Sequence, residues 1–230
     1  MEPGKLIVFD MDGVLVEVTE SYRESVVRTV EHFTGTRIER DRIQDYKNQG
    51  GWNNDWALSQ RICADLGREI DYDTVVEIFN QYFLGPRGDG GGGLIQRERW
   101  LPEDGLLDRL AARYRLGIFT GRVRKELGIT LDRFAAGIPF DPTLCTGEVP
   151  RGKPSPDGLQ MIADRHPGAG LSYVGDTVDD SGCARAAGVP FIGVAAAANP
   201  RRAELVRLFE RDGAVAVIEN INELEAVLPA

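Results

Sequence analysis

The chain has 230 residues, enough for one large domain or for a core with a smaller inserted unit. Its formal net charge of −9 argues against a broad nucleic-acid-binding face and against binding to anionic membranes, because both partners favour a basic surface. The three cysteines are widely spaced, so neither a disulfide framework nor a thiolate zinc site is expected.

The first predicted strand is the apolar run at residues 6–9, which leads into Asp10, Asp12 and Gly13. The run predicts a buried strand, and the glycine predicts the turn that ends it. Ligands of open α/β sheets bind at the carboxyl ends of strands. Two acids there can divide the chemistry, one attacking or binding metal while the other moves protons. A solvated turn is the alternative interpretation of the pair on its own.

The segment from Thr19 to about Leu84 has apolar residues spaced by three and four, which predicts helices. These helices are expected at 21–33, 36–46, 54–66 and 72–83. The glycine-rich segment 85–93 predicts a flexible connection back to the rest of the chain. A phosphate-binding loop is less favoured there, because no strand precedes it and no Gly-Lys-Ser/Thr ends it. Residues 17–98 are therefore expected to form a smaller, all-helical second domain.

After Pro102, predicted helices and strands alternate. Helices are expected at 103–113, 123–131, 155–166, 177–187, 200–210 and 221–227. Strands are expected at 114–120, 143–146, 171–175, 190–194 and 214–218. This alternation predicts an α/β fold with a doubly wound, Rossmann-like parallel sheet, formed by residues 1–16 and 99–230.

Polar residues also follow later predicted strands. Thr120 and Gly121 can hold phosphate oxygens through a hydroxyl and backbone N–H groups, with a helix cap as the alternative for Thr120. Lys153 lies in a proline-flanked turn, where a fixed ammonium can neutralise phosphate charge. Asp176 and Asp180 are one helical turn apart and can face the same point. Oxygen ligands of this kind suit Mg²⁺ rather than zinc, and stabilisation of a helix dipole is the alternative.

Together these motifs resemble the haloacid dehalogenase (HAD) superfamily of hydrolases. The matching motifs are Asp-x-Asp-Gly at 10–13, Thr-Gly at 120–121, Lys-Pro-x-Pro at 153–156 and Gly-Asp-x-x-x-Asp at 175–180. The resemblance covers the whole chain and is closest to the phosphoglycolate-phosphatase-like branch, which has a helical cap inserted after the first motif. It also implies a cis peptide bond between Lys153 and Pro154.

The resemblance implies roles for the acids. Asp10 would be the nucleophile and Asp12 the general acid/base. Asp10, Asp176 and the backbone carbonyl of Asp12 would hold Mg²⁺. Asp180 would be either a metal-site acid or an acid that orients the lysine.

The resemblance also implies how substrate is bound. Thr120, Lys153 and the Gly121 N–H would bind the phosphate, while Arg122 could reach the far end of the substrate or only pair with a core acid. The loop at residues 50–56 lies where such caps carry specificity residues.

In that loop, Trp52 offers an apolar wall and Asn53 and Asn54 offer amides for a hydroxylated group. Cap core for Trp52 and a helix N-cap for Asn54 are the alternatives.

The function implied is a Mg²⁺-dependent phosphatase that hydrolyses a small phosphorylated metabolite through an aspartyl-phosphate. Asp12 argues against the dehalogenases, which lack the second acid of the first motif. A sugar phosphomutase is the enzymatic alternative, and a non-catalytic phosphometabolite-binding protein is the alternative of another class. We expect a cytoplasmic monomer or homodimer without a signal peptide, since residues 1–5 lead directly into the first strand.

Overall fold

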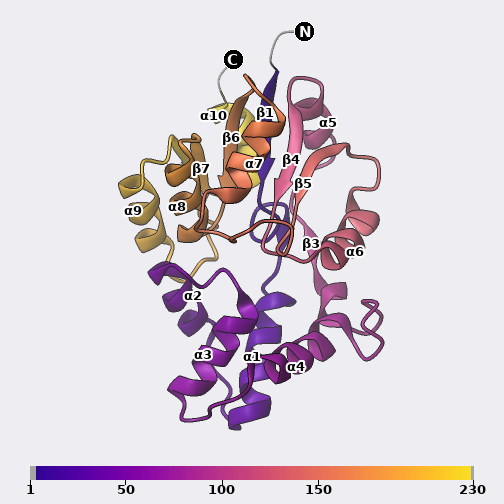
Figure 1. Cartoon of the computed structure of the whole chain (residues 1–230), viewed down its shortest axis with the longest axis vertical. Coiled ribbons are helices and arrows are strands. Elements are labelled where there is room, and N and C mark those ends of the chain that lie inside the picture. Colours follow the sequence, from indigo (N-terminus) through magenta and orange to yellow (C-terminus); the bar gives the residue numbers. More distant parts are fainter. Residues whose placement is uncertain (1–3, 229–230) are drawn as a thin grey trace. The chain divides into compact units, whose positions relative to one another are not determined.

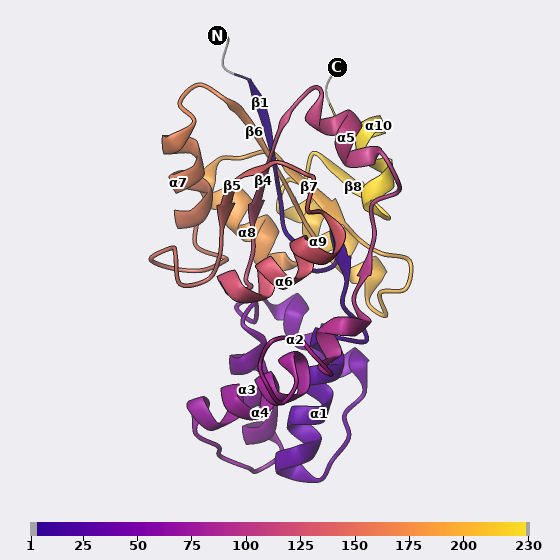
Figure 2. The same cartoon turned by 90° about the vertical axis from the view of Figure 1, so that its right-hand side faces the viewer.

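The computed structural model describes residues 4–228, and the chain divides into two compact units (Figures 1 and 2). The core unit consists of the residues up to Val16 and those from Trp100 onward. The cap unit consists of Glu17–Arg99. Within the described part of the chain, every helix is too short or too polar to cross a membrane.

The core unit contains a six-stranded parallel sheet in the order β5-β4-β1-β6-β7-β8. Its strands are β1 (Lys5–Phe9), β4 (Arg115–Phe119), β5 (Phe140–Leu144), β6 (Gly170–Gly175), β7 (Phe191–Val194) and β8 (Ala216–Ile218). The inner strands β1 and β4 are buried beyond their first residues, as expected for a sheet covered on both faces. The predicted α/β, doubly wound, Rossmann-like core is confirmed.

Helices cover both faces of this sheet (Figure 1). One face packs on α7 (Asp157–Arg165), α8 (Val178–Ala187) and α9 (Arg202–Arg211), which bury apolar side chains in one cluster with β1, β4 and β6. The opposite face carries α5 (Leu106–Ala111) and α6 (Arg124–Phe134). The chain then ends in η2 (Ile221–Glu223) and α10 (Leu224–Val227). This arrangement follows from right-handed crossovers between parallel strands.

The cap unit is built from helices. They are α1 (Tyr22–Thr34), α2 (Arg40–Gln49), α3 (Asp55–Asp65), α4 (Tyr72–Leu84) and the 3₁₀ helix η1 (Leu94–Arg97). Tyr22 of α1 packs against Phe83 of α4 with ring centroids 4.0 Å apart and ring planes tilted by 35°, and both residues are buried. The two segments that connect the units pair as the short strands β2 (Val16–Glu17) and β3 (Arg99–Trp100).

Several elements differ in their bounds from the sequence expectation, and two of these differences have a clear physical reason. The strand expected at 143–146 is β5, Phe140–Leu144, and it contains Pro142. A proline is tolerated because β5 is the edge strand, where the sheet shifts register around that residue. The helix expected at 36–46 begins only at Arg40, after an extended Glu39. The sequence did not predict this start, because the helix has too few apolar residues to show a clear period.

Candidate active site

Three strand ends of the core unit meet at one edge of the sheet. Phe9, the last residue of β1, pairs with Ile118 of β4 and with Val174 of β6. The N–H of Asp10 donates to the carbonyl oxygen of Val174 at 2.8 Å. The residues that follow β1, β4 and β6 therefore lie at the carboxyl edge of the sheet, where ligands of such folds bind.

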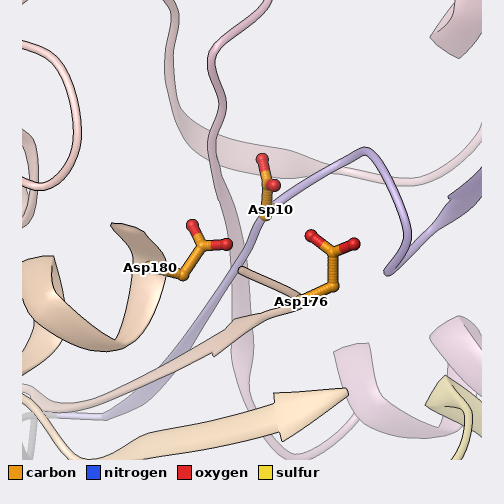
Figure 3. A group of neighbouring side chains, drawn as sticks. All are labelled: Asp10, Asp176 and Asp180. Carbon is orange, nitrogen blue, oxygen red and sulfur yellow. The ribbon is translucent and has the colours of Figure 1, made fainter. Parts of the chain in front are cut away.

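Three acidic side chains converge at this edge. Oxygens of Asp10, Asp176 and Asp180 all lie within 4.8 Å of one another. Figure 3 shows the three carboxyl groups gathered around a common space, Asp10 after β1, Asp176 after β6 and Asp180 on α8. Residues from the first and last motifs of the sequence are thus brought together.

Lys153 lies between two of these acids. Its Nζ is 2.9 Å from Oδ1 of Asp10 and 2.8 Å from Oδ1 of Asp180, and its side chain is 1% exposed. The rings of Phe119 and Tyr173 lie 5.3 and 5.5 Å from the ammonium. Burial alone would lower the pKa of Lys153, but the two carboxylates outweigh burial and raise it. The lysine therefore stays charged in the site. The peptide bond to Pro154 is cis, which confirms that expectation.

Asp180 is held by hydrogen bonds on both oxygens. Oδ1 accepts from the Tyr173 hydroxyl at 2.7 Å, and Oδ2 accepts from the N–H and hydroxyl of Thr177 at 3.0 and 2.6 Å. Burial raises the pKa of Asp180, but Lys153 and these donors lower it below its usual value. Because its oxygens are already engaged, the geometry favours the lysine-orienting role among the two considered for this acid.

The pKa of Asp10 is shifted in the opposite direction to that of Asp180. Burial raises its pKa to about 7; Lys153 opposes this rise, while Asp180 and Asp12 add to it. One ammonium thus faces several carboxylates in a buried site, which leaves an excess of negative charge. An all-oxygen donor set with this excess fits Mg²⁺, and Asp10 and Asp176 are the residues that would hold it. Gly13 supports the fit, because its missing side chain makes room for the Asp176 carboxylate.

Thr120 follows β4 with its hydroxyl fixed by the backbone. Its Oγ1 accepts a hydrogen bond from the N–H of Arg122 at 3.2 Å, and its own N–H donates to the carbonyl of Leu144 at 3.0 Å. A hydroxyl that accepts through one of its two lone pairs can still donate its hydrogen, here to a bound anion. Gly121 lies between these two anchored residues.

The structure places Arg122 inside the core unit. Its side chain is 0% exposed, and its Nε donates to Oδ1 of Asp12 at 2.9 Å. Of the two roles considered for Arg122, the contacts match pairing with a core acid rather than reaching the far end of a substrate.

The residues of the 50–56 loop belong to the cap unit. Asn54 is the N-cap of α3, since its Oδ1 accepts from the N–H groups of Trp56 and Ala57 at 2.9 and 3.0 Å. The ring of Trp52 meets that of Tyr46 edge to face, with centroids 5.7 Å apart. Asn53 is half-buried beside them.

Some residues of the site have no obvious signal in the sequence. Tyr173 and Thr177 hold Asp180, and Thr130 on α6 accepts a hydrogen bond from Arg122 at 2.6 Å. Tyr173 lies on β6 three residues before Asp176, and this nearness to the motif is the one hint in the sequence that it belongs to the site. Thr130 is indistinguishable in sequence from any other helical threonine.

Among curated proteins, the chain is 33% identical over 199 residues to an imidazoleglycerol-phosphate dehydratase of Phytophthora nicotianae, a match that covers 84% of this chain and 43% of that protein. The chain therefore spans less than half the length of this relative. It is 23% identical over 196 residues to the pyrophosphatase PpaX of Bacillus velezensis, covering 82% of each.

Solved structures share the fold. A protein from Bacteroides fragilis described as a haloacid dehalogenase-like hydrolase has a TM-score of 0.75 and 22% identity, covering 96% of this chain and 99% of that one. A predicted phosphoglycolate phosphatase from Haemophilus somnus has a TM-score of 0.74 and 19% identity, covering 99% of each chain. A protein from Thermotoga maritima described as a β-phosphoglucomutase has a TM-score of 0.66 and 19% identity, covering 97% of this chain and 100% of that one.

The family model of the haloacid dehalogenase-like hydrolases matches residues 5–188, a span that runs from β1 through the acids on α8. The resemblance inferred from the four motifs is thereby confirmed, and with it the expectation of an enzyme: the chain belongs to the haloacid dehalogenase-like hydrolases.

Proposed function

We propose that the protein is a Mg²⁺-dependent phosphatase that hydrolyses a small phosphorylated metabolite. The observation that carries the proposal is the convergence of Asp10, Lys153 and Asp176, with Asp12 two residues beyond the nucleophile candidate. A buried carboxylate beside a fixed ammonium suits nucleophilic attack on a phosphate ester.

In the first step, an oxygen of Asp10 attacks phosphorus and forms an aspartyl-phosphate while the bond from phosphorus to the ester oxygen breaks. Asp12, protonated at that moment, gives its proton to the leaving oxygen, so that the alcohol departs neutral. In the second step, Asp12 takes a proton from water, and the water oxygen attacks phosphorus. The phosphorus–oxygen bond to Asp10 breaks, releasing inorganic phosphate and restoring the carboxylate.

Other residues of the core unit stabilise charge during these steps. Lys153, the Thr120 hydroxyl and the Gly121 N–H would bind the oxygens of the transferring phosphoryl group. Asp180 orients Lys153 through their 2.8 Å ion pair. Mg²⁺ bound by Asp10 and Asp176 would offset the repulsion between the carboxylate and the phosphate dianion.

The substrate is proposed only as a class. PpaX is named as a pyrophosphatase, and the Haemophilus protein is described as a phosphoglycolate phosphatase. Both names are compatible with phosphate release from a small anion. We do not assign the dehydratase activity named for the Phytophthora relative to this chain, because the match covers only 43% of that protein.

The test is phosphate release from a panel of phosphorylated metabolites, with and without Mg²⁺. We expect turnover that depends on Mg²⁺ and is lost on chelation. Asp10→Asn should reduce kcat by at least about 10⁴-fold, the scale on which enzymes lose activity with their nucleophile. Asp108→Asn, at an exposed position on α5, is the matched control and should keep full activity.

Three outcomes would overturn the proposal. Comparable phosphate release by the Asp10→Asn protein would remove the nucleophile assignment. Interconversion of sugar phosphates without phosphate release would identify a phosphomutase, and binding of the panel compounds without any turnover would identify a non-catalytic protein.

A further inference from the structure

We propose that Arg122 is a positioning residue that fixes Asp12 so that Oδ2, and not Oδ1, carries the transferred proton. This inference rests on the proposed phosphatase function and assigns how its acid/base group is held. Arg122 lies 110 residues from Asp12 in the sequence, and the fold alone brings them together.

The guanidinium grips one oxygen of Asp12. Nε donates to Oδ1 at 2.9 Å, and Nη2 donates to the same oxygen. Two donors on one oxygen occupy its lone pairs. An arginine keeps its own protons under all ordinary conditions, so this oxygen cannot also hold the proton that is transferred. The exchangeable proton therefore belongs on Oδ2.

Arg122 is itself held rigidly. Nη1 donates to the hydroxyl of Thr130 on α6 at 2.6 Å. Its backbone N–H donates to Oγ1 of Thr120 at 3.2 Å, and its carbonyl accepts from the N–H of Thr146 at 2.9 Å. An arginine fixed at both its backbone and its side chain can hold a partner carboxylate in one orientation.

Arg122 and Asp12 differ in how exposed their side chains are. The Arg122 side chain is 0% exposed, whereas the Asp12 side chain is 28% exposed. The arginine is thus closed off from a ligand at the sheet edge, and the aspartate remains accessible to one. The Arg122 side chain reaches the reaction through Asp12.

Proton donation by Asp12 matters most when the leaving alcohol is a poor leaving group, because such an alkoxide needs the proton as the phosphorus–oxygen bond breaks. A nitrophenolate leaves readily without it. Loss of positioning should therefore reduce kcat/KM for alkyl phosphates far more than for activated aryl phosphates. A merely structural role would lower kcat/KM for all esters by the same factor.

The experiment measures kcat/KM for a series of phosphate monoesters, from dinitrophenyl phosphate to alkyl phosphates, at saturating Mg²⁺. For Arg122→Met we expect a loss of about 10²-fold or more on alkyl esters and little loss on the dinitrophenyl ester, matching the scale of general acid catalysis. The dependence on leaving-group pKa should become steeper. Asp12→Asn should show the same steepening, and the double variant should lose little more than either single one.

Arg124→Met is the matched control, since Arg124 is exposed and binds Glu148 and Thr143 instead. Its leaving-group dependence should equal that of the wild type. Thr130→Val is a second test variant, which removes one anchor of the guanidinium but keeps the charge. Thr130→Val should make the dependence of kcat/KM on leaving-group pKa steeper, though by less than Arg122→Met does. It also provides the test if Arg122→Met does not fold.

An unchanged leaving-group dependence in both Arg122→Met and Thr130→Val would overturn this inference while leaving the phosphatase intact. Absence of phosphate release from every ester by the wild-type enzyme would instead overturn the proposed function. Guanidinium ion added to Arg122→Ala should restore turnover of alkyl esters preferentially, and equal stimulation of all esters would also contradict the positioning role.

Discussion

A Cβ atom on Gly13 would lie 2.0 Å from Oδ2 of Asp176 and 2.4 Å from its Cγ. Gly13 also has a φ of 73°, in the left-handed region that favours glycine. The turn after β1 and the carboxylate after β6 therefore share a space that any side chain at position 13 would fill. The Asp176 carboxylate of the last motif can take its place only because position 13 of the first motif has no side chain.

Gly13→Ala should displace the Asp176 carboxylate, because the added Cβ would occupy the space that this carboxylate fills. We expect weaker Mg²⁺ binding and a large loss of kcat, with the fold retained. Magnesium affinity by calorimetry and phosphate release would measure both. Gly188→Ala is the matched control: Gly188 has a φ of 69° but no atom within 4 Å of an added Cβ. It should cost only the left-handed strain of about 1–2 kcal/mol and leave Mg²⁺ binding intact.

Lys153→Met should destabilise the protein by about 3–5 kcal/mol, because it leaves the carboxylates of Asp10 and Asp180 buried without their ammonium. Those acids can take up protons instead, so the loss should be larger at about pH 8 than at about pH 5. Urea denaturation without Mg²⁺ measures the change. Lys125→Met, at an exposed position on α6, should have little effect. A loss under about 1 kcal/mol for Lys153→Met, the range of exposed ion pairs, would contradict the buried-pair assignment.

Magnesium binding should release a proton from Asp10. Burial raises the pKa of this carboxyl to about 7, and the metal binds only the ionised form. Below that pKa a proton must leave Asp10 before the ion binds. Each unit by which the pH is lowered should therefore reduce the Mg²⁺ affinity by up to about tenfold. Above that pKa, affinity should level off. Calorimetry in buffers of different ionisation enthalpy counts the protons, and Asp10→Asn should abolish their release. Affinity independent of pH between about 5.5 and 7 would refute the raised pKa.

Asn54→Ala should destabilise the cap unit by about 1 kcal/mol, because α3 loses the N-cap that accepts from Trp56 and Ala57. Thermal unfolding measures this loss. Asn53→Ala, one residue earlier and outside the cap position, is the comparison and should cost less. A change in substrate preference without a change in stability for Asn54→Ala would favour the binding role over the capping role.

Trp52→Ala tests whether the cap unit sets substrate choice. If Trp52 provides an apolar wall for the substrate, the variant should change the ratio of kcat/KM values across the metabolite panel. That ratio is insensitive to the amount of folded enzyme, so lost packing against Tyr46 would not move it. An unchanged ratio would assign Trp52 to the cap core alone.

Much of the fold is readable from local pattern. The apolar run at 6–9 and the alternation after Pro102 predicted the parallel core, because buried strands and amphipathic helices repeat with different periods. The elements that were misplaced carry weak local signals. Pro142 interrupts the strand pattern of β5, so the strand was expected too late in the chain. In α2, Ile43 is the one aliphatic residue, so the helical period is weak.

The candidate site divides in the same way. The sequence by itself determined which acids, which lysine and which threonine make up the motifs of the site, because a parallel sheet collects its strand ends at one edge. Only the tertiary structure decided that Arg122 pairs with Asp12 and that Tyr173 and Thr177 hold Asp180. Side-chain direction and burial depend on packing between elements far apart in the chain, and no local pattern of residues encodes them.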